Sequence, residues 1–234
     1  MKNDHPAKEQ ISAWAIACSL SAASKEMIEQ NIWVQCLQPE LQGASWISLT
    51  KENNMVFSNV NLVRVAGGSF AIPKIACLLK KPTKSLGALF TLIKIRRVYL
   101  KKKHTMEQVR ILMLAGLETA VCYLNFHSYS KSIMVDEYGK IDFYFKEEFL
   151  GSVSSSTNNF WQTSNRNTKE KPSIVITFKD LNTAYRGALG KIDPLVDAAE
   201  KNVLVRGRIP LIEKFGYISR LAMKEVPIPK TIRA

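Results

Sequence analysis

The spacing of apolar residues predicts a mostly helical N-terminal region. Apolar positions recur every three to four residues over 7–37, and Pro39 ends this stretch. Two short apolar segments, 46–49 and 60–65, are separated by a polar turn and predict a β-hairpin. Residues 86–103 again show helical spacing, with a basic stripe beside a broad apolar arc, a pattern shared by interfacial helices and by basic helices packed on a core.

The middle of the chain predicts a buried helix followed by a second hairpin. Over 106–126 the apolar positions indicate nearly complete burial of a helix. A polar turn at 136–139 is flanked by 132–135 and 140–146, which predicts two antiparallel strands. Apolar and polar residues alternate in the second strand. One of its faces is therefore expected in the core and the other, which carries Asp142, in water.

The last part of the chain alternates short strands and helices. Residues 151–171 are rich in Ser, Asn and Thr and predict a loop, with Phe160-Trp161 as a short strand or an exposed aromatic tip. Residues 174–178 are apolar on both faces and predict a central strand. Asp180 is a favoured helix N-cap, and Gly190 ends that helix. The remaining predicted elements are a short helix at 194–199, a strand at 203–205 and a helix that begins at Pro210.

Charge is distributed unevenly along the chain. The formal net charge is +13, and residues 60–104 contain eleven Lys or Arg residues without a single Asp or Glu. Such a block is typical of proteins that bind an anionic membrane or nucleic acid, and it also occurs as a solvated face that keeps a protein soluble. For membrane docking, the candidate residues are Lys94, Arg96, Arg97, Lys101, Lys102 and Lys103.

The cysteines and histidines do not follow a metal-binding pattern. The four cysteines are far apart, and the three histidines do not lie at ligand spacing from them, so no metal site is expected. Reduced thiols are consistent with a cytoplasmic protein. The uncharged stretch 11–23 lacks the positive start of a secretory signal, and no run of apolar residues is long enough to predict a membrane-spanning helix.

The run from Ile174 to Gly207 resembles a known family. It contains a strand (IVITF), an Asp-initiated helix (LNTAYRGALG), the turn GKIDP, a short helix and a strand that ends in glycine (VLVRG). This order resembles the sterol carrier protein type two domain. The resemblance covers about residues 106–226 and is most specific over 172–207.

The resemblance implies an α+β fold with a five-stranded sheet covered by helices on one face. Between them the family holds an apolar tunnel for a sterol, fatty acid, fatty-acyl-CoA, phospholipid or isoprenoid lipid, without catalytic machinery or a cofactor. The expected organisation is a basic, mostly helical region at 1–104 and a sterol-carrier-like domain at 105–228. Apolar positions that either line such a tunnel or pack against one another are Phe143, Phe145, Leu189, Ile209, Leu211, Phe215 and Ile218.

The resulting hypothesis is a lipid-binding carrier that is cytoplasmic, peripheral to an anionic membrane, and not an enzyme. A second hypothesis is an accessory scaffold that recruits lipid-metabolising enzymes, such as those of quinone biosynthesis, through residues 1–60 around Trp14, Trp33 and Trp46. Nucleic-acid binding is less well supported, because the basic block lacks interleaved aromatic residues. Catalysis is less well supported too, because no nucleophile, metal or phosphate-loop motif occurs.

Overall fold

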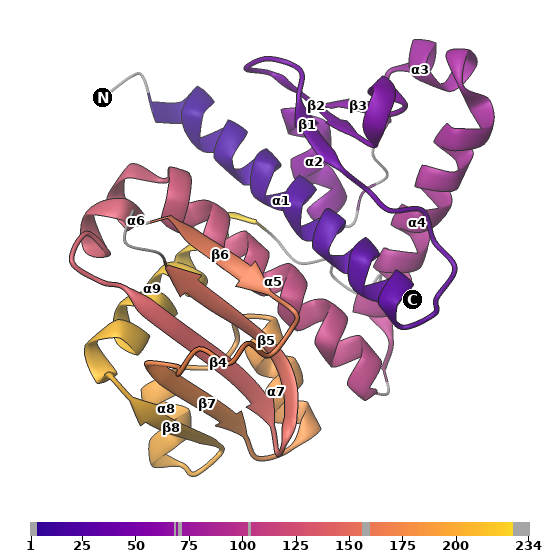
Figure 1. The fold of residues 1–234 in the computed structure, drawn as a ribbon. Helices are drawn as coiled ribbons and strands as arrows, with labels where there is room; N and C mark the ends of the chain where they lie inside the picture. The colour runs from indigo at the N-terminus through magenta and orange to yellow at the C-terminus, as the bar shows by residue number, and fades with distance from the viewer. Residues whose placement is uncertain (1–3, 68, 70–71, 103, 156–159, 227–234) are drawn as a thin grey trace. The chain divides into compact units, whose positions relative to one another are not determined.

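The computed structural model describes residues 4–67, 69, 72–102, 104–155 and 160–226 (Figure 1). The chain divides into two compact units. Unit 1 comprises residues 1–102 together with 225–234, and unit 2 comprises residues 103–224.

Unit 1 combines helices with a small antiparallel sheet (Figure 1). The sheet has the strand order β1-β2-β3. Its core contains large side chains from the sheet and from the helices around it, and these include Met27, Leu37, Ile47, Phe57, Leu62 and Ile95. The elements are α1 (Asp4–Glu29), β1 (Pro39–Leu41), β2 (Trp46–Leu49), the 3-10 turn η1 (Lys51–Asn53), β3 (Val56–Ser58), α2 (Asn59–Ala66), α3 (Ile75–Lys80) and α4 (Pro82–Leu100).

Helix α1 is shorter than the predicted 7–37. It ends at Glu29, and Asn31 adopts a left-handed conformation with φ of 60°. The backbone N–H of Ile32 donates to the carbonyl of Met27, and that of Asn31 donates to Ile28. This pair of bonds is a Schellman motif, which closes a helix when the residue after it tolerates a left-handed backbone.

The first predicted hairpin is half correct. Strand β2 forms as predicted and pairs with β3, where Trp46 faces Ser58. The predicted second strand at 60–65 is wrong, because these residues lie in α2. Ser58 is the N-cap of α2, because its hydroxyl accepts a hydrogen bond from the backbone N–H of Asn61. A helix therefore begins directly before the residues that were predicted as a strand.

Unit 2 confirms the α+β class and the five-stranded sheet. The strand order is β6-β5-β4-β7-β8, with β4 and β7 parallel and the other neighbours antiparallel. In Figure 1 the helices α5 and α9 lie behind the sheet. The elements are α5 (Met106–Phe126), α6 (Ser128–Ile133), β4 (Gly139–Phe145), β5 (Glu148–Ser155), β6 (Trp161–Ser164), β7 (Ile174–Phe178), α7 (Leu181–Ala188), α8 (Pro194–Ala199), β8 (Val203–Gly207) and α9 (Ile209–Glu225).

Helix α5 forms over the predicted residues and is the central helix of unit 2. Among the described residues it is the one helix long and apolar enough to cross a membrane, with a mean hydropathy of 1.4, and 83% of that window is buried. Asn125 near its end binds the backbone of Trp161 twice, through its amide N–H and its carbonyl, each at 2.8 Å. These bonds fix the edge strand β6 against the helix.

The predicted hairpin of 132–135 with 140–146 is wrong in its first strand. Residues 128–133 form α6, and the hairpin partner of β4 is β5, across a two-residue turn at Lys146-Glu147. Most of β5 lies in the stretch 151–171 that was predicted as loop, whereas β6 begins at the predicted Trp161. Serine-rich β5 becomes a strand because both of its edges find hydrogen-bonding partners in the sheet.

The face of β4 that carries Asp142 is buried, contrary to the prediction. The segment 165–173 joins β6 to β7, and these strands lie on opposite sides of β5 and β4, so the segment must cross the sheet. Its Asn167 amide donates to the hydroxyl of Tyr144, and the carbonyl of Glu170 accepts a bond from Lys140. A long crossover thus covers positions that the local pattern assigned to water.

The C-terminal elements follow the prediction closely. Strand β7 lies between β4 and β8, as expected for a central strand. The Asp180 carboxylate accepts a bond from the backbone N–H of Thr183 at 2.7 Å and caps α7. Gly190 follows α7 with φ of 63°, a backbone conformation that glycine adopts at low cost.

Candidate functional site

The candidate site is an apolar cavity inside unit 2. Its volume is about 60 Å³, and it lies between the helix-covered face of the sheet and three helices. Strands β4 and β7 contribute Phe143, Ile176 and Phe178. The described lining residues from the helices and the turn after α7 are Met113, Gly116, Leu117, Gly187, Ala188, Gly190, Ile192, Phe215, Gly216, Ser219, Arg220 and Met223.

The space exists because the helices present small residues toward it. Gly116 on α5 packs so closely on α7 that a Cβ there would lie 2.7 Å from the carbonyl oxygen of Ala188. Gly187 and Ala188 on α7, with Gly216 on α9, also line the cavity. Small side chains on converging helices leave a gap where larger ones would fill the core to normal packing density.

One charged residue stands among the described residues that line this cavity. Arg220 on α9 lies 3.1 Å from the carboxylate of Asp193, and the side chains are 42% and 43% exposed. The pair therefore lies at the solvent-accessible rim. A cation at the mouth of an otherwise apolar cavity is a polar group of the kind that orients an amphipathic ligand.

Two of the seven predicted lipid-facing residues line the cavity. They are Phe143 and Phe215, whose ring centroids are 6.1 Å apart. The other five lie elsewhere in unit 2. Leu189, Leu211 and Ile218 are buried, Phe145 is half-buried and Ile209 is 44% exposed.

Sequence reasoning missed most of the remaining lining residues. Met113, Gly116 and Leu117 recur at helical spacing on α5, and Ser219 and Met223 do so on α9. Spacing alone marks such residues as facing the core. It does not distinguish a position that borders a cavity from one that fills space, since this depends on the partners from other elements.

The predicted docking residues lie at the C-terminal end of α4 and just after it. Lys94 donates to the backbone carbonyl of Trp33 at 2.7 Å, and its ammonium lies 4.7 Å from the ring centroid of Phe90. Arg97 is exposed, and Arg96 is half-buried. Lys101 and Lys102 are exposed beyond the helix, and Lys103 falls outside the described residues.

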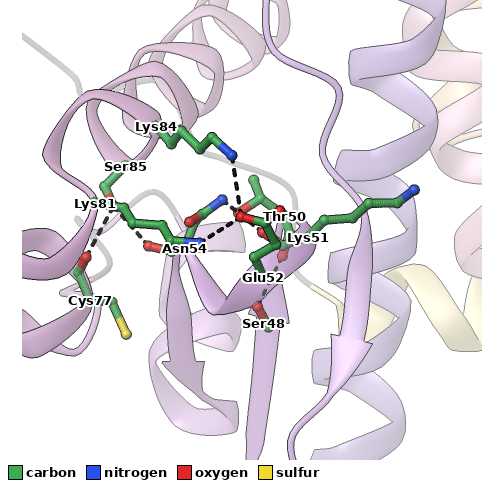
Figure 2. Close-up of polar contacts among 9 residues, drawn as sticks. All are labelled: Ser48, Thr50, Lys51, Glu52, Asn54, Cys77, Lys81, Lys84 and Ser85. Carbon is green, nitrogen blue, oxygen red and sulfur yellow. Dashed lines mark hydrogen bonds and ion pairs between the residues drawn. The ribbon is translucent and has the colours of Figure 1, made fainter.

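Two other lysines of the basic block have a local anionic partner, as Figure 2 shows. The Glu52 carboxylate lies 2.5 Å from the ammonium of Lys81 and 3.3 Å from that of Lys84. These hydrogen bonds, that of Lys81 foremost, lower the pKa of the Glu52 carboxyl. Lys81 and Lys84 thus connect α4 to the turn between β2 and β3.

That turn has an unusual backbone. Thr50, Glu52 and Asn53 have φ values of 101°, 67° and 55°, which non-glycine residues adopt at a cost of about 1–3 kcal/mol each. Ser85 of α4 supports the turn, since its buried hydroxyl donates to the carbonyl of Asn54 at 2.8 Å (Figure 2). The polar contacts around the turn offset part of this strain.

No protein-family model matches this chain, and no curated protein matches it. No group of three or more His, Cys, Asp or Glu residues that could hold a metal ion occurs within the described residues.

Proposed function

We propose that this protein is a lipid-binding carrier and that unit 2 holds an acyl or isoprenoid chain in the cavity between its sheet and α5, α7 and α9. The observation that carries the proposal is the apolar cavity, with Arg220 at its rim. Each methylene group that leaves water for such a site contributes about 0.8 kcal/mol. Hydrophobic burial would therefore supply much of the binding free energy once the cavity admits a chain.

The resemblance to the sterol carrier protein type two domain supports the same function. A five-stranded sheet with helices over one face and an apolar space between them is the arrangement that this resemblance implies. The resembling run 174–207 forms β7, α7, α8 and β8. It also contributes residues to the cavity, among them Phe178 and Gly187.

The cavity must widen to hold a ligand. Its volume of about 60 Å³ is far below the roughly 300–1,000 Å³ of pockets that hold small-molecule ligands. Met113 and Met223 face the cavity, and unbranched methionine side chains readily adopt other rotamers. We expect a bound chain to displace these side chains and to separate α9 from the sheet.

Arg220 is proposed to receive the head group of the ligand. Its present partner, Asp193, lies in the turn before α8 at 3.1 Å. An exposed ion pair of this kind contributes about 0–1 kcal/mol. A carboxylate or phosphate on the lipid can therefore replace Asp193 at little cost, which favours a chain with an anionic head over an uncharged sterol.

The accessory scaffold is a second candidate, and the small volume of the cavity favours it. If the cavity does not widen, unit 2 binds no lipid and has a structural role. Unit 1 would then recruit a lipid-metabolising enzyme. Of the tryptophans expected at such a surface, Trp33 is 77% exposed, whereas Trp14 and Trp46 are half-buried.

The test is native mass spectrometry of the purified full-length protein, followed by denaturing extraction and lipid analysis. A co-purified lipid, or saturable uptake of a fluorescent fatty acid, supports the carrier. Ser219→Phe places a large ring in the cavity, and Ser219→Ala leaves it open, so only the first is expected to abolish uptake. An empty protein that takes up no fatty acid refutes the carrier and favours the scaffold.

A further inference from the structure

Helix α4 of unit 1 has two faces of different character. Its inner face is buried and carries Ser85, Ala88, Thr91, Ile95 and Val98. Its outer face presents Leu86, Phe90 and Ile93, which are 62%, 40% and 38% exposed, followed by the exposed Arg97. These four positions are spaced i, i+4, i+7 and i+11 and therefore form one stripe along the helix.

Trp33 extends this stripe. Its side chain is 77% exposed, and its ring centroid lies 6.0 Å from that of Phe90. Lys94 fixes this arrangement, because its ammonium binds the Trp33 carbonyl and lies close to both rings. The stripe is thus an organised apolar surface with a cation at its edge. We define the α4 surface as Trp33, Leu86, Phe90, Ile93, Lys94 and Arg97.

The neighbouring helix α3 is also apolar and exposed. Ile75 and Leu79 are 66% and 79% exposed. Single exposed apolar residues are ordinary, but adjoining ones, as Trp33 and Phe90 are on the α4 surface, mark a surface that binds a partner or a membrane. Tryptophan is the side chain most typical of the membrane interface, since its ring is apolar and its N–H finds a hydrogen bond there.

The charge of the surrounding chain favours an anionic bilayer as the partner. Residues 60–104 contain no acidic residue, and Lys101 and Lys102 follow α4 directly as exposed cations. Cations beside exposed aliphatic and indole side chains are the composition of helices that lie in the lipid headgroup region. A nucleic acid would use the cations but has no apolar surface to match Leu86 and Ile93.

We propose that the α4 surface binds anionic lipid bilayers, with α4 parallel to the membrane plane. Trp33, Leu86, Phe90 and Ile93 enter the boundary between head groups and acyl chains. Arg97, Lys101 and Lys102 contact anionic head groups. This surface belongs to unit 1, and the proposal does not depend on what the cavity of unit 2 holds.

The test is co-sedimentation of the full-length protein with vesicles of phosphatidylcholine alone or mixed with phosphatidylglycerol. We expect binding only to the anionic vesicles, weakened by added salt. Leu86→Ser and Phe90→Ser are each expected to weaken binding about tenfold, because each removes apolar surface from the bilayer. Arg97→Gln is expected to weaken it about fivefold, the equivalent of one cation near the membrane surface.

Matched controls lie on unit 2. Leu204, which is 49% exposed on β8, is replaced by serine, and the exposed Lys169 by glutamine, and neither change is expected to alter binding. Thermal unfolding of every variant checks that the fold is intact. In the anionic vesicles, a blue shift of tryptophan fluorescence that disappears in Trp33→Phe supports insertion.

Three outcomes overturn the proposal. The first is equal or absent binding to neutral and anionic vesicles. The second is anionic binding that Leu86→Ser and Phe90→Ser leave unchanged, which would indicate a purely electrostatic attraction. The third is a dimer that Leu86→Ser dissociates, without vesicle binding, since a second copy of the chain would then cover the surface. Lipid bound to unit 2 is measured separately by extraction. Failure of membrane binding is therefore distinguishable from failure of the carrier function.

Discussion

Lys140 and Asp142 form an ion pair inside unit 2, on the face of the sheet opposite the cavity. The Lys140 ammonium lies 3.0 Å from the Asp142 carboxylate, and each side chain is 2% exposed. The segment 165–173 covers them, and the carbonyl of Glu170 accepts a further bond from Lys140 at 3.4 Å. Burial raises the pKa of the Asp142 carboxyl, although Lys140 beside it acts in the opposite direction.

Breaking this pair from one side should strongly destabilise the protein. Asp142→Asn leaves the Lys140 charge buried without an anion, so we expect the free energy of unfolding to fall by about 3–5 kcal/mol. Replacing both residues, as Lys140→Met with Asp142→Leu, removes both charges and should cost far less. Urea unfolding of the three proteins checks this, and equal losses in the single and double variants would contradict it.

The N-cap of α7 should give an acid-sensitive contribution to stability. The backbone N–H of Thr183 donates to the Asp180 carboxylate, which lowers the pKa of this carboxyl below its ordinary value of 3.8. The stabilisation is therefore present above this value and lost as the pH falls through the lowered pKa.

We expect Asp180→Ala to lower the free energy of unfolding by about 1 kcal/mol near neutral pH. This difference from the wild type should shrink as the pH falls below the ordinary Asp value. Asp180→Asn retains an acceptor that does not titrate, so its loss should be smaller at neutral pH. Urea unfolding as a function of pH measures both, and a pH-independent effect of Asp180→Ala would argue against the cap.

The contact between α4 and the β2–β3 turn should depend on one hydroxyl. Ser85→Ala removes the buried hydrogen bond to the Asn54 carbonyl, and we expect a loss of about 1–3 kcal/mol. Thr83, two residues earlier on the same helix, is exposed on the opposite side, and Thr83→Ala is the matched control. If the two variants unfold at the same urea concentration, the hydroxyl does not support the turn.

The close approach of α5 and α7 should exclude even a methyl group. Gly116→Ala places a Cβ 2.7 Å from the Ala188 carbonyl oxygen and 3.1 Å from the Met223 side chain. We expect a loss of about 1–3 kcal/mol in unfolding free energy, because the two helices must separate. Thermal unfolding tests this, and a stabilised variant would mean that the helices adjust without strain.

The proposed role of Arg220 in binding the head group is tested by removing its charge. Arg220→Gln should weaken uptake of a fluorescent fatty acid by about tenfold, if the loss of a hydrogen-bonded charge costs about 1.5 kcal/mol. Lys224→Gln, one turn further on the same helix, changes an exposed cation outside the cavity and serves as control. Equal affinity in all three proteins would place the head group elsewhere.

The sequence by itself determined the elements whose signals are local. The helix at 106–126, the central strand at 174–178 and the cap at Asp180 form as predicted. Periodicity reports which side of an element is apolar, and capping side chains bond to a backbone only three residues away. The concentration of cations at 60–104 is likewise a property of the sequence alone.

Only the tertiary structure decided the pairings and the surfaces. Strand β4 pairs with 148–155 rather than 132–135, and Asp142 is buried by a crossover from distant residues. The cavity arises where small residues of three helices meet over Phe143 and Ile176. Leu86 and Phe90 are exposed because α4 packs through its opposite face. Each of these features depends on contacts between elements, and the spacing of residues within one element does not specify which partner it meets.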